Sequence, residues 1–247
     1  MARIGLQLYT LRDAAAADLA GTLARVGRLG FEGVELFALD GVDAGELRHL
    51  LDVNGLAAAG RHASLADVEE RLDPLAAELG TLGTDRVTLA WIDPPESAAD
   101  ADVLVDRLVE CGRRARERGL VFGFHNHWGE LRPLDDGRTF LDRLLELPAD
   151  LVTLELDLGW VWDAGADPEE LLTRAAGRCR LVHVKDFSSR GNRAFAPVGD
   201  GAVGYDRVVP AAIRAGAEWL IVEQDEIDGP PFEAVERSLA AVRRFAG

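Results

Sequence analysis

The stretch LVTLELDLGWVWDAGADPEELLTRAAGRCRLVHVK, residues 151–185, begins and ends with a short apolar run, and a longer segment separates the two runs. The first run closes on Asp157, and the second contains His183 and closes on Lys185. Short apolar runs of this length are typical of buried strands, and strands joined by a longer helical segment are typical of parallel β/α units. The stretch therefore predicts one repeat of a parallel α/β fold.

The same alternation of short apolar runs and longer helical stretches continues along the whole chain of 247 residues. Glycines precede several runs and are expected to end the helices, because glycine adopts a left-handed conformation at little cost. These glycines are Gly30, Gly55, Gly80, Gly119 and Gly216. Eight strand–helix pairs without a linker predict a single α/β domain over residues 1–247, a closed (β/α)8 TIM barrel. The expected strands are residues 3–9, 33–37, 56–62, 86–91, 120–125, 151–157, 180–185 and 219–225.

The charge and composition of the chain limit its partners. The sequence holds 27 lysines and arginines against 43 aspartates and glutamates, so its field repels a phosphate backbone and nucleic acid is not an expected partner. No apolar run approaches the roughly 18 residues of a membrane helix, and no leader-like segment is present, so we expect no membrane association and a cytoplasmic location. Cys111 and Cys179 lie far apart without a CxxC spacing and are expected to be reduced core residues.

Polar residues gather at the carboxyl ends of the expected strands. Because alternate residues of a strand face opposite sides, Glu155 and Asp157 point into the barrel, as do His183 and Lys185 and, on the last strand, Glu223. Active sites of such barrels lie at these strand ends, and each buried ionisable group needs a partner or a metal. We therefore expect a metal site at the mouth of the barrel. The expected ligands are His125, Asp157, His183 and Glu223.

The types of these ligands indicate which ion the site would take. Nitrogen and carboxylate donors without thiolates suit a divalent ion such as Mn²⁺, Zn²⁺, Mg²⁺, Co²⁺ or Fe²⁺. Such an ion polarises a carbonyl and stabilises an enediolate, as proton removal next to the carbonyl of a sugar requires. Two alternatives stay open. Asp157 could cap the segment that follows it, and Lys185 could pair with Asp186 or a neighbouring glutamate instead of contacting substrate.

Seven motifs together resemble the sugar phosphate isomerase/epimerase family, the xylose-isomerase-like TIM barrels. The likeness covers nearly the whole chain and is closest to the branch with HNH on the fifth strand, which includes proteins resembling inosose dehydratase. The motifs are IGLQLYTLRD (4–13), GFEGVELF (30–37), FGFHNHWGEL (122–131), ELDLGWVWDAGADP (155–168), RLVHVKDF (180–187), PVGDG (197–201) and EWLIVEQDE (218–226).

The resemblance implies a metal held by a Glu, an Asp, a His and a Glu from strands five to eight. Three of these positions correspond to Asp157, His183 and Glu223. The chain departs from the pattern on strand five, where His125 stands in the place of the first glutamate. The fourth ligand is therefore His125, His127 or Glu130.

The function that follows is a metal-dependent sugar or sugar phosphate isomerase or epimerase, which moves a proton through a metal-stabilised enediolate. The main alternative is a dehydratase, a lyase of a keto-sugar or keto-inositol like inosose dehydratase, for which one base suffices. A metal-free sugar-binding barrel is a further alternative. The expected partner is a small polyol or sugar, and homo-oligomerisation is left open. The expected catalytic residues are His125, Glu223 and Lys185, and the expected substrate-binding residues are Gln7, Glu35, His62, His127 and Trp160.

Overall fold

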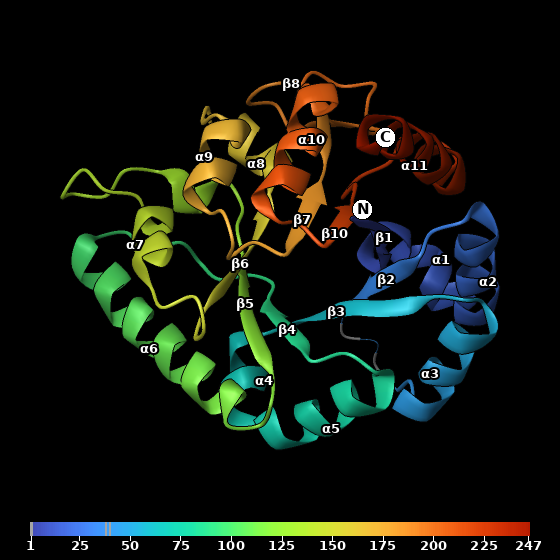
Figure 1. Ribbon diagram of the computed structural model, residues 1–247, viewed down its shortest axis with the longest axis horizontal. Coiled ribbons are helices and arrows are strands. Elements are labelled where there is room, and N and C mark those ends of the chain that lie inside the picture. Colours follow the sequence, from blue (N-terminus) through green and yellow to red (C-terminus); the bar gives the residue numbers. More distant parts are fainter. Residues whose placement is uncertain (1, 38, 40) are drawn as a thin grey trace.

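The computed structural model describes residues 2–37, 39 and 41–247 and shows a closed parallel barrel (Figure 1). Around the barrel the strands follow the order β1-β10-β7-β6-β5-β4-β3-β2, which is chain order once the small β8–β9 sheet is set aside. The predicted (β/α)8 TIM barrel is confirmed. The strands are β1 (Arg3–Gln7), β2 (Gly33–Leu36), β3 (Ala57–Ala63), β4 (Arg86–Leu89), β5 (Val121–His125), β6 (Thr153–Asp157), β7 (Leu181–Val184) and β10 (Trp219–Val222).

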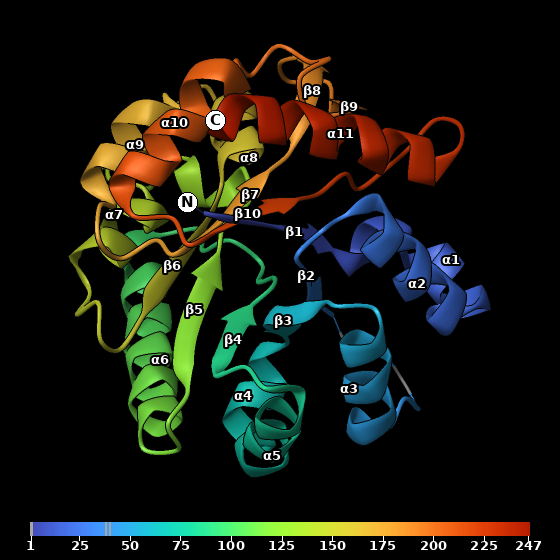
Figure 2. The same cartoon turned by 45° about the vertical axis from the view of Figure 1, so that its right-hand side comes forward.

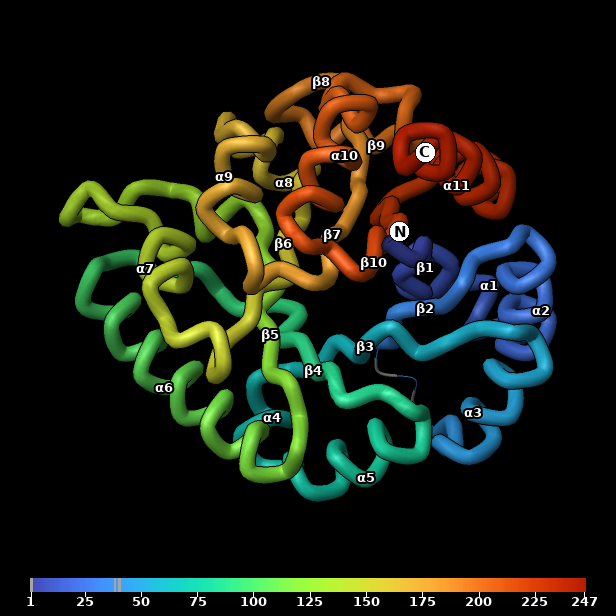
Figure 3. The backbone as a smooth tube through the Cα atoms, viewed as in Figure 1, coloured from blue at the N-terminus to red at the C-terminus, as the bar shows by residue number. Residues whose placement is uncertain are grey.

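Helices surround the barrel and bury their apolar faces against the outward side chains of the strands (Figure 2). The last helix packs against β1, which brings the two ends of the chain near each other (Figure 3). Within the described ranges, no helix has the length and apolar character needed to cross a membrane. The helices are η1 (Leu8–Leu11), α1 (Arg12–Ala17), α2 (Leu19–Leu29), α3 (Ala44–Val53), α4 (Leu65–Glu70), α5 (Leu72–Leu82), α6 (Ala98–Arg116), η2 (Gly129–Leu131), α7 (Phe140–Glu146), α8 (Leu158–Asp163), α9 (Pro168–Arg174), α10 (Tyr205–Ala215) and α11 (Pro231–Ala246).

The expected strands overlap the observed ones, but several of them end earlier than predicted. The first strand ends at Gln7 because the Gln7 side chain accepts a hydrogen bond from the N–H of Tyr9 at 3.1 Å and starts a 3-10 turn. The last barrel strand ends at Val222, so the polar residues after it stand on a loop. A short antiparallel pair, β8 (Asp186–Ser189) and β9 (Ala194–Ala196), follows β7 and was not among the expected strands.

Gly30 and Gly216 cap α2 and α10 as the sequence predicts, whereas Gly55 and Gly119 follow the caps Asn54 and Glu117 of α3 and α6. Four of the five expected glycines have a positive φ, as a left-handed helix end requires. Gly80 is the exception, because it lies inside α5. Gly83, with φ of 77°, ends that helix instead. Both cysteines are buried and unpaired, as predicted.

A small apolar cluster closes the amino-terminal end of the barrel. Its largest member is the Trp219 side chain, which packs with Leu181 and Ile221. Gly33 makes room for it, because a Cβ on Gly33 would lie 2.6 Å from Trp219 Cη2 and 2.5 Å from the carbonyl oxygen of Ala57. The lower end of the barrel is therefore a packed core, and polar side chains fill only the levels above it.

We predict that Gly33→Ala destabilises the fold by roughly 1–3 kcal/mol, because the new methyl group overpacks the space beside Trp219. Gly80→Ala is the matched control, since Gly80 lies inside α5 and a Cβ there would meet nothing within 4 Å. That variant is expected to gain roughly 0.5–1 kcal/mol. Urea unfolding of the two variants and the wild type measures both changes. Equal stability of the two variants would contradict the packing described.

Candidate active site

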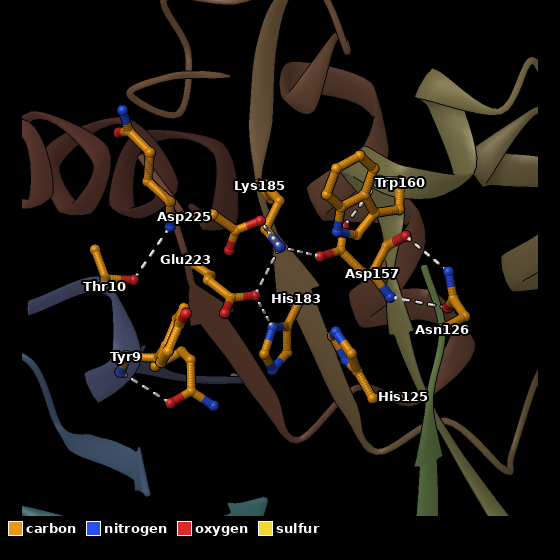
Figure 4. Close-up of polar contacts among 12 residues, drawn as sticks. Tyr9, Thr10, His125, Asn126, Asp157, Trp160, His183, Lys185, Glu223 and Asp225 are labelled. Atoms are coloured by element: carbon orange, nitrogen blue, oxygen red, sulfur yellow. Dashed lines mark hydrogen bonds and ion pairs between the residues drawn. The ribbon is translucent and has the colours of Figure 1, made fainter. Parts of the chain in front are cut away.

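Strand register brings the predicted polar residues together above the apolar cluster. Asp157 on β6 pairs in register with His183 on β7. Two residues before Asp157 on β6, Glu155 pairs in register with His125 on β5. Figure 4 shows the cluster that results, in which side chains from several strands point toward one another. The expectation that these residues converge at the carboxyl ends of the strands therefore agrees with their positions.

Lys185 joins three carboxyl groups at the top of this cluster. Its Nζ lies 3.0 Å from Asp157 Oδ2, 3.0 Å from Glu223 Oε2 and 3.1 Å from Asp225 Oδ2 (Figure 4). Burial opposes the charge of Lys185, but Asp157, Glu223 and Asp225 outweigh it and raise the pKa of the amine. Lys185 is the only lysine of the chain, which otherwise uses arginine for its permanently charged basic side chains. A compact ammonium therefore stands where a planar guanidinium would be harder to fit.

Of the two partners that the sequence offered for Lys185, Asp186 does not pair with it, whereas a glutamate, Glu223, does. The Asp186 carboxylate instead accepts hydrogen bonds from the backbone N–H groups of Gly199, Gly201 and Val203. It therefore holds the glycine-rich loop after β9 in place. Asp225, at the end of the last expected strand, takes the third position around Lys185.

Three histidines surround one oxygen of Glu155 in the layer below Lys185. Glu155 Oε1 lies 2.6 Å from His62 Nε2, 3.1 Å from His183 Nε2 and 3.3 Å from His125 Nδ1. The second oxygen, Oε2, accepts a hydrogen bond from the hydroxyl of Thr88 at 2.8 Å. Glu155 was not among the predicted ligands, although its place two residues before Asp157 gives both side chains the same inward direction.

His183 connects the two layers. Its Nδ1 lies 2.7 Å from Glu223 Oε2, and its Nε2 lies 2.6 Å from Glu35 Oε2. The same Glu35 oxygen accepts a hydrogen bond from the Gln7 amide at 2.9 Å. Gln7 and Glu35 are fully buried and do not line the cavity described below. Glu35 contacts His62 and His183, and Gln7 supports Glu35.

The surroundings assign opposite charge states to the histidines. Burial disfavours a charged His62, but Glu35 and Glu155 outweigh it and raise its pKa to about 10. Burial also disfavours a charged His183, but nearby carboxylates, Glu223 above all, outweigh it and raise the pKa of His183 well above the ordinary value. Burial, with the charge of His183, lowers the pKa of His125 to about 3. At neutral pH His125 is therefore an uncharged imidazole between two charged ones.

Asp157 both caps a helix and belongs to the site. Its Oδ1 accepts a hydrogen bond from the N–H of Trp160 at 2.9 Å and so caps α8. Its own N–H donates to Asn126 Oδ1 at 3.1 Å, while Oδ2 faces Lys185 (Figure 4). Burial raises the pKa of Asp157 to about 6, although Lys185 acts in the opposite direction. The two roles that the sequence offered for Asp157 are therefore compatible.

The donor atoms fit a metal ion in two ways. Within each of two groups, one donor atom per residue lies within 4.8 Å of all the others. Both groups use His125 and His183. In the metal-free chain, Asp157 Oδ2 is paired with Lys185 Nζ at 3.0 Å and His125 Nδ1 lies 3.3 Å from Glu155 Oε1, so an ion would replace these contacts. We call the predicted set the upper group: His125, Asp157, His183 and Glu223. We call the other set the lower group: His62, His125, Glu155 and His183.

The other two candidates for the fourth ligand belong to neither group. Glu130 is buried, and its Oε2 accepts a hydrogen bond from the backbone N–H of His127 at 2.9 Å. The carboxylate thus supports the turn after β5. His127 has a buried Nδ1 without a hydrogen-bond partner among the described residues, and its ring centroid lies 4.5 Å from that of Trp91.

A cavity of about 710 Å³ opens above the cluster. Its polar floor is formed by five side chains: His62, His125, His127, Glu223 and Asp225. Of the other predicted site residues, Trp160 lines the wall, whereas Asp157, His183 and Lys185 stand behind the floor. A ligand in this cavity therefore meets His125 and Glu223 directly.

Comparison with known proteins gives three findings. The model of the xylose isomerase-like TIM barrel family matches residues 23–245. Inosose dehydratase from Bacillus cereus (strain AH820) is 27% identical over 167 residues, 59% of this chain and 55% of that protein. Inosose dehydratase from Geobacillus thermodenitrificans (strain NG80-2) is 29% identical over 167 residues, with the same coverage of 59% and 55%. The chain thus spans about half the length of these curated relatives.

Solved structures share the fold over their whole length. A sugar phosphate isomerase/epimerase from Parabacteroides distasonis ATCC 8503 superposes with a TM-score of 0.87 at 20% identity, covering 100% of both chains. An L-ribulose 3-epimerase superposes with a TM-score of 0.78 at 19% identity, covering 100% of this chain and 95% of the other. At these identities the superpositions support the barrel architecture.

We predict that Lys185→Met destabilises the metal-free protein by roughly 3–5 kcal/mol at neutral pH, because it leaves buried carboxylates unpaired. Loss of the ammonium removes the influence that lowers the pKa of Asp157, Glu223 and Asp225. The folded-state pKa values of Asp157 and Asp225, which burial already raises, then rise further, and that of Glu223 rises from its lowered value. The deficit is therefore largest above about pH 7 and shrinks as the pH falls toward 5 and the groups take up protons.

The control is Arg107→Met, which removes a half-exposed guanidinium 2.9 Å from Glu69. It is expected to change stability by less than about 1 kcal/mol at every pH. Denaturant unfolding between pH 5 and 8, after dialysis against a chelator, gives both profiles. A Lys185→Met deficit that does not vary with pH would show that the three carboxyl groups do not depend on this ammonium.

Proposed function

Because the chain belongs to the xylose isomerase-like TIM barrel family, we propose that it is a metal-dependent isomerase or epimerase of a sugar or sugar phosphate. The observation that carries the proposal is that His125 and Glu223 line the same cavity floor. Burial raises the pKa of Glu223, but Lys185 and His183 outweigh it, so the group is a carboxylate, while His125 is neutral. Glu223 is therefore the proposed proton acceptor next to the carbonyl, and His125, whose pKa is lowered to about 3, is proposed as the weaker second base that faces the same substrate.

The upper group is the proposed seat of the metal. Its donors are two imidazoles and two carboxylates, which suit a divalent ion such as Mn²⁺, Zn²⁺, Co²⁺, Fe²⁺ or Mg²⁺. When bound there, such an ion polarises the substrate carbonyl and stabilises the negative charge that follows proton removal. Lys185 stands beside two of the four donors, so its ammonium competes with a cation for Asp157 and Glu223.

The remaining residues divide between binding the substrate and supporting those that bind it. We assign substrate hydroxyl groups to His62 and His127 and the apolar face of the substrate to Trp160, because all three line the cavity. Lys185, which the sequence predicts to be catalytic, is buried behind the floor and is proposed to hold the Glu223 carboxylate in position. Gln7 and Glu35 are proposed to orient the histidines rather than to touch the substrate, since both lie beneath them.

Dehydration of a keto-sugar or keto-inositol is the second candidate. Both curated relatives named above are inosose dehydratases. Elimination needs one base and an acid that protonates the departing hydroxyl group. His62 lines the cavity and is held 2.6 Å from Glu155 Oε1, whose charge keeps it protonated. It is therefore in place to act as that acid.

The metal position can be tested with residues that belong to only one group. Asp157→Asn is expected to weaken metal binding by more than the roughly 10–100-fold that changes outside the ligand sphere cause. His62→Gln, which alters only the lower group, is expected to retain the metal. Lys185→Met is expected to bind the metal more tightly than the wild type, because a competing charge is gone. Isothermal titration with Mn²⁺ and Zn²⁺, together with elemental analysis, measures all three.

The opposite pattern, loss in His62→Gln and retention in Asp157→Asn, would place the ion in the lower group. Retention in both variants would exclude the buried cluster as the metal site. Circular dichroism of each variant in the metal-free state serves as the control for folding.

The reaction can be tested by proton NMR in D₂O with a panel of keto-sugars and inososes. Isomerisation or epimerisation is expected to exchange a carbon-bound hydrogen for deuterium without loss of water, whereas dehydration gives a product lighter by one water. His62→Gln separates the two further. It is expected to spare proton exchange in an isomerase and to abolish elimination in a dehydratase. Absence of both exchange and dehydration across the panel, with metal bound, would contradict an enzymatic role of this kind.

A further inference from the structure

The walls of the cavity are aromatic, and the proposed reaction does not use most of these rings. Four large hydrophobic side chains are exposed in the described ranges, and two of them, Tyr9 and Trp91, line this cavity. Their exposed fractions are 41% and 46%. Apolar rings left open to water inside a cavity indicate a ligand that covers them.

The aromatic side chains form two facing walls. One wall runs through Trp91, Trp128, Trp160 and Phe195, with successive ring centroids 5.7, 4.9 and 5.8 Å apart. These residues follow or lie in the segments after β4, β5, β6 and β7. The second wall is the Tyr9–Phe37 pair, with centroids 5.6 Å apart and positions after β1 and β2. Because β1 and β2 lie across the barrel from β5 and β6, the two walls face each other over the floor.

The wall is continuous with the polar floor. The Trp91 ring lies 4.5 Å from the His127 ring in an edge-on arrangement, and His127 in turn lies 4.9 Å from His125. If a ligand places a carbonyl at His125, the part of it that reaches toward the mouth of the cavity therefore lies along Trp91. The Arg193 guanidinium already stacks 3.8 Å above Trp128, so this wall accepts a flat group.

The cavity has room for a ligand of drug size. At about 710 Å³ it falls in the range of roughly 300–1,000 Å³ that encloses a drug-sized ligand. A free monosaccharide carries hydroxyl groups on nearly every carbon and cannot cover two aromatic walls while it lies on the floor. The polar floor and the apolar walls therefore fit two chemically different parts of one ligand.

We propose that the substrate is a sugar or cyclitol that carries a planar apolar substituent, such as an aryl group. The polyhydroxylated ring lies on the floor, and the substituent stacks between the aromatic walls. The proposal rests on the proposed function for the floor, and it adds the class of substrate. Stacking on aromatic rings and removal of apolar surface from water supply the preference for such a substituent.

The test uses pairs of glycosides that do not react, the phenyl and methyl β-glycosides of glucose, galactose and xylose, with phenol alone as a further ligand. Isothermal titration of the metal-loaded protein is expected to show at least one phenyl glycoside binding roughly tenfold or more tightly than its methyl partner. Trp91→Ala is expected to remove most of that preference. Trp162→Ala is the matched control, because Trp162 lies on α8 away from the cavity lining and stacks with Arg190.

Equal binding within every phenyl–methyl pair would overturn the proposal, and so would a preference that survives Trp91→Ala. Phenol binding as tightly as the phenyl glycosides would also overturn it, because the apolar part would then act without the floor. This binding experiment does not depend on turnover. A phenyl preference lost in Trp91→Ala would support the proposed substrate class even if the keto-sugar panel showed no reaction, so failure of the substrate class and failure of the proposed reaction are distinguishable.

Discussion

Charge balance in the buried cluster is the constraint on which the rest of the site depends. A carboxylate removed from water needs a partner, and an unpaired one costs several kcal/mol. Five carboxyl groups share three cationic side chains here, so the metal-free cluster lacks two positive charges. A divalent ion ligated by His183 adds two positive charges and displaces the proton of that histidine, so it makes up part of the deficit. The carboxyl groups are those of Glu35, Glu155, Asp157, Glu223 and Asp225, and the cations are His62, His183 and Lys185.

The apolar end of the barrel determines the level at which this cluster lies. Along β10 and the residue that follows it, the inward residues change from Trp219 and Ile221 to Glu223, and on β7 they change from Leu181 to His183. The switch from apolar to polar occurs within two residues on both neighbouring strands. The polar groups therefore meet directly above a packed core, where water cannot reach them from below and where the field between charges is weakly screened.

The barrel and the inward direction of its polar residues could be predicted from the sequence, because both follow from the two-residue period of a strand. The partners of each group could not be predicted. Lys185 is next to Asp186 in the chain, yet it pairs with Asp157, Glu223 and Asp225. Consecutive side chains point to opposite sides, so Asp186 faces the glycine-rich loop instead. Glu155 could not be identified as a possible ligand either. Its place on the inward face of the strand is the same as that of Asp157, and only the three-dimensional structure shows that three histidines lie beside it.

His183 explains how one cluster can offer two cation positions. A histidine that ligates a metal through one nitrogen commonly donates its other N–H to a carboxylate. Glu223 lies 2.7 Å from Nδ1 and Glu35 lies 2.6 Å from Nε2, so either nitrogen could ligate while the other keeps a carboxylate partner. The Lys185 ammonium competes with a cation in the upper group but not with one in the lower group. Lys185 Nζ lies 3.0 Å from both Asp157 Oδ2 and Glu223 Oε2, so a cation that binds between these carboxylates must displace the ammonium from at least one of them.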